Sequence, residues 1–144
     1  MVTPRYLLDT NVVSEAARVK PNPNVMKRLE RHKDELATAS IVWHELVFGC
    51  DRLPSSEKRT QLEIFLSELS NSSMLIFPYD TEAAAWHGRE RARLSRLGLT
   101  PAFADGQIAS IAKVHDLILV TNNTRNYRHF DQLKMENWHG MIKN

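Results

Sequence analysis

The chain has 144 residues, 42% of them hydrophobic, and a formal net charge of +2. This composition is too apolar for a disordered chain and too weakly charged for a strongly basic nucleic-acid binder. No apolar run approaches the roughly 18 residues of a membrane span, and the N-terminus lacks the pattern of a secretion signal. The single cysteine, Cys50, has no partner for an internal disulfide and fits a reducing compartment. We therefore expect one cytoplasmic domain, residues 1–144, without membrane association.

Short apolar runs alternate with helical patterns in the first half of the chain. In chain order we predict a strand at 6–8, a helix from Thr10 or Asn11 to about Ala17, a helix opened by Asn24, a strand at 36–40 ending in the cap Ser40, a helix at 41–51, and a helix opened by Ser55 or Ser56. The last helix carries an apolar stripe of Leu62, Phe65, Leu66 and Leu69. Such a stripe fits the core, a dimer contact or a groove for a partner.

The alternation continues in the second half. We predict, in order, a strand at 74–77, a helix from Asp80 or Thr81 to about Leu97 that Gly98 ends, a loop at 100–104, a helix at 105–115, a strand at 117–121, a polar turn with a short helix near Tyr127, and an extended piece that includes Leu133 and Met135. Regular alternation is typical of a parallel sheet with helices on both faces. The predicted fold class is α/β, a three-layer α/β/α sandwich with a central, mainly parallel sheet of four or five strands.

Three isolated acids stand in structured settings. Asp9 ends the first predicted strand, at the edge where α/β proteins bind ligands, and Asp105 stands at a predicted helix start, where the helix dipole stabilises a carboxylate. Glu45 lies in an apolar helix segment without lysine, so its partner is a cation or a residue from elsewhere. If the fold joins the three, they form a site for Mg²⁺ or Mn²⁺, whose bound water can cleave a phosphodiester. Taken alone, Asp9 and Asp105 also fit helix caps, and Glu45 also fits a surface or ion-paired residue.

Other polar and aromatic residues carry weaker signals. The six histidines lack zinc-site spacing, which argues against zinc. One face of the predicted helix at 81–97 is basic, through Arg89, Arg93 and Arg96, and can follow an RNA backbone or simply face solvent. Trp138 is a candidate anchor for the C-terminal tail.

Ordered segments of the chain resemble the motifs of PIN-domain ribonucleases, and more closely those of VapC-type toxins from bacterial toxin–antitoxin pairs. The segments are Leu7-Leu8-Asp9-Thr10-Asn11 with Ser14-Glu15, Ser40 with Glu45-Leu46 and Gly49, Asp105 with Ile108-Ala109, Leu119-Val120-Thr121-Asn122-Asn123, and Glu136-Asn137-Trp138. The first four of these segments, in the right order and in a chain of the right length, make the resemblance strong. The last resembles the end of those toxins, and the match covers nearly the whole chain.

The resemblance implies a PIN-like fold and Mg²⁺- or Mn²⁺-dependent cleavage of single-stranded RNA regions by a water nucleophile. It places Asp9, Glu45 and Asp105 at the acidic positions that hold the metal, and Asn123 at a fourth catalytic position that often carries an acid. Asn126 lies where a second acid can follow. Because both asparagines are neutral, we expect one metal ion rather than two.

The resemblance also implies partners and supporting residues. The hydroxyls of Thr10 and Thr121 are candidates to orient the water or a carboxylate. The implied partners are an RNA substrate and a VapB-like antitoxin whose tail fills a groove of the toxin and which carries the complex to operator DNA. A homodimer is expected, and a heterotetramer or larger assembly with the antitoxin is compatible with it.

Two other functions stay open at this point. A catalytically weak or inactive PIN-like module that binds RNA or a protein would explain the neutral Asn123 and Asn126. A phosphatase of another α/β class can also begin with an acid at a strand end. Its usual second acid two residues later is absent, because position 11 is asparagine.

Overall fold

The computed structural model describes residues 3–140, whose centre is a five-stranded sheet of order β3-β2-β1-β4-β5. All neighbouring strands are parallel. The strands are β1 (Tyr6–Leu8), β2 (Leu36–Ala39), β3 (Leu75–Phe77), β4 (Ile118–Val120) and β5 (Met135–Glu136). The predicted parallel sheet of four or five strands is confirmed.

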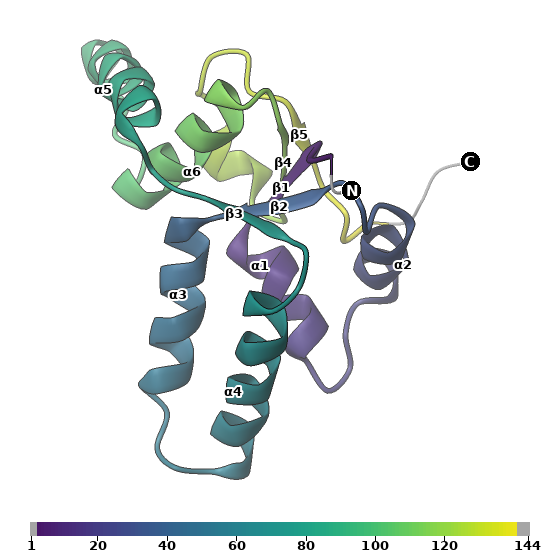
Figure 1. Cartoon of the computed structure of the whole chain (residues 1–144). Coiled ribbons are helices and arrows are strands. Elements are labelled where there is room, and N and C mark those ends of the chain that lie inside the picture. The colour runs from purple at the N-terminus through teal and green to yellow at the C-terminus, as the bar shows by residue number, and fades with distance from the viewer. Residues whose placement is uncertain (1–2, 141–144) are drawn as a thin grey trace.

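Helices cover both faces of this sheet, with α5 and α6 on one side and α1, α3 and α4 on the other (Figure 1). The helices are α1 (Thr10–Val13), η1 (Ser14–Ala17), α2 (Pro23–Arg31), α3 (Ser40–Asp51), α4 (Glu57–Ser70), α5 (Thr81–Arg96), α6 (Phe103–Val114) and η2 (Thr124–Tyr127). The fold is therefore the predicted α/β sandwich. None of the helices in the described residues is long and apolar enough to cross a membrane.

Several helix starts differ from the prediction. Asp9, rather than Thr10 or Asn11, caps α1, because its backbone is extended and its side chain accepts the Thr10 N–H. The second helix begins at Pro23 with Asn22 as cap, an arrangement that suits a proline at the first helical position. The predicted caps Ser56 and Asp80 are confirmed.

Two further helix starts lie earlier than expected. Ser40 is already helical and is preceded by Ala39, which makes no side-chain cap, so the expected Ser40 cap is wrong. α6 begins at Phe103 rather than Asp105, and the predicted loop is correspondingly shorter. Asp105 therefore lies inside the first turn of α6, where its side chain projects from a fixed backbone.

The core lies between the sheet and the helices that pack directly on it. Leu7 in β1 and Leu119 in β4 have no exposed surface, and Ile108 and Ile111 of α6 pack against them in the same cluster. In contrast, α4 has no fully buried residue. Of its predicted stripe, Phe65 and Leu69 pack against the core, so the stripe serves the core only in part.

A cavity of about 720 Å³ lies between α4 and the segment around η1. Its apolar lining comes from Leu46 of α3 and from Leu62, Phe65 and Leu66 of α4, and its basic lining from Arg18, Lys20 and Lys58. The rest of the predicted apolar stripe thus faces this cavity.

Candidate active site

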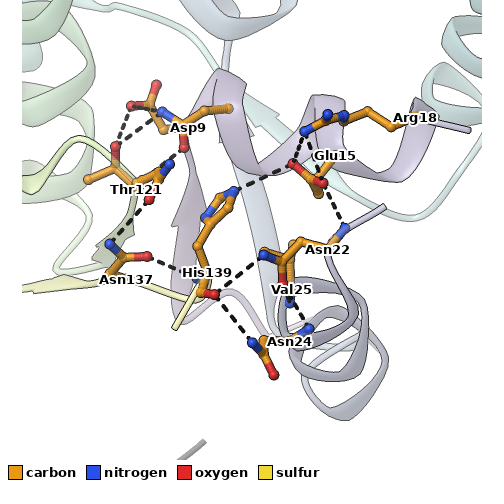
Figure 2. A network of polar contacts seen from close by, with 11 residues as sticks. Asp9, Glu15, Arg18, Asn22, Asn24, Val25, Thr121, Asn137 and His139 are labelled. Carbon is orange, nitrogen blue, oxygen red and sulfur yellow. Dashed lines mark hydrogen bonds and ion pairs between the residues drawn. The ribbon is translucent and has the colours of Figure 1, made fainter. Parts of the chain in front are cut away.

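The sheet reverses its strand order between β1 and β4, and polar side chains follow both strands at this point. In parallel α/β sheets, ligands bind outside the carboxyl ends of the strands where the order reverses. Asp9 follows β1 and donates its backbone N–H to Val120 of β4 at 2.9 Å. Thr121 follows β4, and its hydroxyl donates to Oδ2 of Asp9 at 2.8 Å (Figure 2). Both residues are buried.

Asp9 is held by several donors. Its Oδ1 accepts the Thr10 N–H at 2.8 Å, and its Oδ2 accepts the Tyr127 hydroxyl at 3.1 Å in addition to that of Thr121. The side-chain amide of Asn11 lies 3.4 Å from the same Oδ2. Asp9 is therefore both the cap of α1 and a carboxyl group held in a fixed position at the sheet edge.

Glu45 projects from the second turn of α3 toward the start of α1. The hydroxyl of Thr10 donates a hydrogen bond to Oε2 of Glu45. This contact supplies the partner from elsewhere that the apolar surroundings of Glu45 required. Thr10 and Thr121 thus both hold carboxylates, which is one of the two roles expected for these hydroxyls.

Asp105 and Asp9 lie on either side of the Tyr127 hydroxyl group. The Tyr127 oxygen lies 3.3 Å from Oδ1 of Asp105 and 3.1 Å from Oδ2 of Asp9. Burial and then the negative charges of Asp9 and Glu45 raise the pKa of Asp105, while the hydrogen bond from Tyr127 acts in the opposite direction. The fold therefore brings the three predicted acids together.

Within residues 3–140, no cationic side chain pairs with this cluster. The ion pairs in this part of the chain include none with Asp9, Glu45 or Asp105. Three carboxyl groups that lie close together without a basic partner offer oxygen ligands to an external cation.

Asn123 and Asn126 lie at the rim of the site. Both are exposed, and the backbone N–H of Asn123 donates to the Thr121 hydroxyl at 3.0 Å. Within residues 3–140 the Asn123 side chain forms no hydrogen bond with the three acids. Its catalytic role stays a prediction.

Sequence reasoning missed Tyr127 as a site residue and left Asn11 without a role. Asn11 links the two strand ends, because its amide nitrogen lies 3.3 Å from the Thr121 hydroxyl and its oxygen accepts the Asn122 N–H at 2.9 Å. Tyr127 is 1% exposed although it follows a run of polar residues. A large aromatic in such a turn was the only sequence signal for its burial.

A second buried acid, Glu15, lies at the other end of the network of polar contacts that begins at Asp9 (Figure 2). The two acids are connected by Asn11, Asn122, Asn137 and His139. Burial alone would raise the pKa of Glu15, but the Asn22 N–H and the charges of Arg18 and His139 outweigh it and lower this pKa. The Asn22 nitrogen lies 2.7 Å from Oε1, and Nε2 of His139 lies 3.5 Å from Oε2. Because its oxygens are already paired, Glu15 is a structural acid rather than a metal ligand.

The predicted basic face of α5 is only partly free. Arg93 pairs with the buried Glu90 and donates to the His129 carbonyl at 2.8 Å, whereas Arg89 and Arg96 are exposed. Two of the three arginines thus remain on the surface for contact with a polyanion.

The donor set at the three acids fits a hard divalent cation. Its members are carboxylate and hydroxyl oxygens, the ligands that Mg²⁺ and Mn²⁺ prefer. Within residues 3–140, however, no three Asp, Glu, His or Cys side chains are arranged to hold a metal ion by themselves. Mg²⁺ usually takes one or two protein carboxylates and keeps several waters. Asp9 and Asp105 are therefore the residues that would hold such an ion, and Glu45 is the third acid beside them.

Comparison with known proteins identifies the family of the chain. Residues 6–133 match the family model of the PIN domain. The chain is 30% identical over 135 residues to the tRNA(fMet)-specific endonuclease VapC of Shigella flexneri, covering 93% of this chain and 98% of that protein. With ribonuclease VapC2 of Haemophilus influenzae the identity is 32% over 135 residues, again covering 93% of this chain and 98% of the relative.

The fold also matches solved structures. The structure of VapBC2 from Rickettsia felis bound to a DNA fragment from their promoter superposes with a TM-score of 0.79 at 30% identity. The match covers 92% of this chain and 98% of that chain. Because the family model spans most of the residues and the likeness extends over nearly whole chains, this protein belongs to the PIN domain family.

Proposed function

We propose that this protein is a divalent-metal-dependent endoribonuclease and the toxin of a toxin–antitoxin pair. The observation that carries the proposal is the meeting of Asp9, Glu45 and Asp105 at the point where the sheet order reverses, with no basic partner among residues 3–140. The family supports it, since PIN-domain ribonucleases generally depend on divalent metals. The relatives named above are described as a tRNA-specific endonuclease and a ribonuclease.

The three acids have two different roles, ion binding and orientation of the attacking water. Asp9 and Asp105 hold the cation, and Asn11 and Thr121 keep Asp9 in place. Glu45, fixed by the Thr10 hydroxyl, orients the attacking water. Mg²⁺ bound here, or Mn²⁺ in its place, supplies a water of lowered pKa and offsets charge on the phosphate. In the hydrolysis that this site would support, the water oxygen bonds to phosphorus as the bond to the leaving oxygen breaks, and the proton that the water loses is balanced by one that the leaving oxygen takes from solvent. Asn123 would support the waters of the ion from the rim.

The partners follow from the same relatives. A solved relative is a VapBC complex on promoter DNA. We infer a VapB-like antitoxin for this chain, a homodimer of the chain, and a heterotetramer or larger assembly with the antitoxin. The cavity between α4 and the η1 segment is our candidate groove for the antitoxin tail, because it offers apolar and basic surface together.

The test is cleavage of total RNA by the purified protein, with and without Mg²⁺, followed by mapping of the new ends. We expect Asp9→Asn and Asp105→Asn to lower the cleavage rate roughly 100-fold or more, because each removes a charge that holds the ion. The matched control is Asp80→Asn. Asp80 caps α5 as Asp9 caps α1, so this variant should cut RNA like the wild type.

The second candidate is a PIN-like module that binds without cutting. The neutral and exposed Asn123 and Asn126 favour it. RNA binding without cleavage across a full Mg²⁺ and Mn²⁺ titration would support the module. Undiminished cleavage by folded Asp9→Asn would show that the metal site is wrongly assigned.

A further inference from the structure

One hydroxyl group joins the two acids that are proposed to hold the ion. We propose that Tyr127 is a positioning residue, whose hydroxyl fixes the spacing and direction of Asp9 and Asp105 for the cation. The proposal rests on the proposed function, because it concerns the same site. Among residues 3–140 no other group hydrogen-bonds to both acids.

The fold holds the Tyr127 ring rigidly. The backbone carbonyl of Tyr127 accepts the Phe130 N–H at 3.1 Å, and the rings of Tyr127 and Phe130 pack with their centroids 6.1 Å apart. Only 1% of Tyr127 is exposed, so water does not compete for its hydroxyl. The phenol supplies the hydrogen-bond donor of this contact, and the carboxylate oxygens accept.

The hydrogen bonds leave particular oxygens available. Oδ2 of Asp9 receives Thr121, Tyr127 and Asn11, whereas its Oδ1 receives only the Thr10 N–H among residues 3–140. Oδ1 of Asp105 lies against Tyr127, and within the same residues its Oδ2 has no hydrogen-bond donor. The single Tyr127 proton is shared between one oxygen of each acid, which leaves acceptor capacity on Oδ1 of Asp9 and Oδ2 of Asp105.

A purely structural role would not need this hydroxyl. Phenylalanine would fill the same core position and keep the packing on Phe130. It would also remove the donor that lies between two like charges. Partners that orient metal ligands typically contribute a factor of about 10 to 100 in metal affinity.

The experiment is a calorimetric titration with Mn²⁺, without RNA, of the wild type, Tyr127→Phe and Tyr79→Phe. We expect Tyr127→Phe to bind Mn²⁺ roughly 10-fold more weakly. Tyr79→Phe is the matched control, since it also deletes a tyrosine hydroxyl that is hydrogen-bonded in the fold, here to Nδ1 of His87 at 2.8 Å. Its affinity should equal that of the wild type.

Unchanged or tighter Mn²⁺ binding by folded Tyr127→Phe overturns the proposal. If the wild type itself binds no Mn²⁺, the proposed function fails, which is a different result. If Tyr127→Phe is too unstable for the titration, melting temperatures measured in EDTA provide a second test. The wild type, Tyr127→Phe, Asp105→Asn and the double variant then form a cycle. Additive shifts contradict the bridging role, and a non-additive double variant supports it.

Discussion

At the scale of single residues, the fold treats two acids in opposite ways. Glu15 receives the Asn22 N–H and lies beside Arg18 and His139, and its pKa is lowered. Asp105 lies beside two other acids, and its pKa is raised. A carboxyl with a raised pKa and like-charged neighbours is costly to the fold and typical of a functional site. This contrast between Glu15 and Asp105 supports the proposal that the active site lies at Asp105.

The raised pKa of Asp105 predicts how Asp105→Asn changes stability in EDTA. As the pH rises from the ordinary carboxyl range through the raised pKa, the folded wild type binds more protons than the unfolded chain, so the wild type loses stability. Asparagine does not titrate. The variant should therefore have the higher melting temperature at pH 7, and the difference should shrink toward pH 4.

Glu15→Gln provides the opposite control. Its folded pKa is lowered, so its stabilising contribution is present above the ordinary carboxyl pKa and is lost as the pH falls. Glu15→Gln should have a lower melting temperature than the wild type at pH 7, and the difference should disappear on acidification.

With saturating Mg²⁺ the melting temperature of the wild type should exceed that of Asp105→Asn, because only the wild type gains binding energy. A difference in melting temperature between Asp105→Asn and the wild type that is the same at every pH would refute this account.

At the scale of elements, the contact between α5 and α6 depends on Gly106. A Cβ at this position would lie 2.1 Å from Nε2 of His87 and 2.7 Å from its Cδ2. The imidazole has little freedom to move, because it is buried and Nδ1 bonds the Tyr79 hydroxyl. Gly106→Ala should therefore lower the free energy of unfolding by about 1–3 kcal/mol, measured by urea denaturation.

Two other helical glycines serve as controls. A methyl group added at Gly49 in α3 or at Gly88 in α5 would meet no atom within 4 Å. Alanine at either position should raise the free energy of unfolding by about 0.5–1 kcal/mol, through helix propensity. In a His87→Ala background, Gly106→Ala should cost much less. An equal cost in both backgrounds would mean that the clash is not with His87.

The elements also show what sequence can predict. Apolar runs such as 6–8 and 118–120 were found because a buried parallel strand is continuously hydrophobic. Helix starts were less certain, because Asp9 and Thr10 both carry oxygens that can cap. The choice between them depends on backbone angles, which residue type does not fix.

The candidate site could be proposed from the sequence where one residue carries one charge, as at Asp9, Glu45 and Asp105, whose roles stay predictions. It was not predictable where the role depends on a distant contact. Glu45 accepts a hydrogen bond from Thr10, which is 35 positions away in the sequence, and Asp9 accepts one from Tyr127, which is 118 positions away. Such pairs have no local pattern, so only the folded chain shows them.

At the scale of the whole molecule, the segment after β5 packs against α2, which lies far away in the sequence. The Asn137 carbonyl accepts from Arg28 at 3.1 Å, and the His139 carbonyl accepts from Asn24 at 3.3 Å (Figure 2). Before this segment, the Glu136 carbonyl of β5 accepts the Thr121 N–H at 3.1 Å. The end of the chain thus supports the strand end that holds Asp9.

Trp138 is the apolar anchor of this closure, as the sequence indicated. It is 1% exposed, its ring meets Tyr6 edge-on at 5.1 Å and stacks on His32 at 5.5 Å, and its Nε1–H donates to Glu136 at 3.0 Å. Trp138→Ala should therefore lower the free energy of unfolding by about 3–5 kcal/mol, measured by urea denaturation. Trp43→Ala removes a tryptophan that is only partly buried on α3 and should cost about 1 kcal/mol. Equal losses in the two variants would show that the C-terminal segment is not part of the cooperative core, and the support of Thr121 from β5 would then need another source.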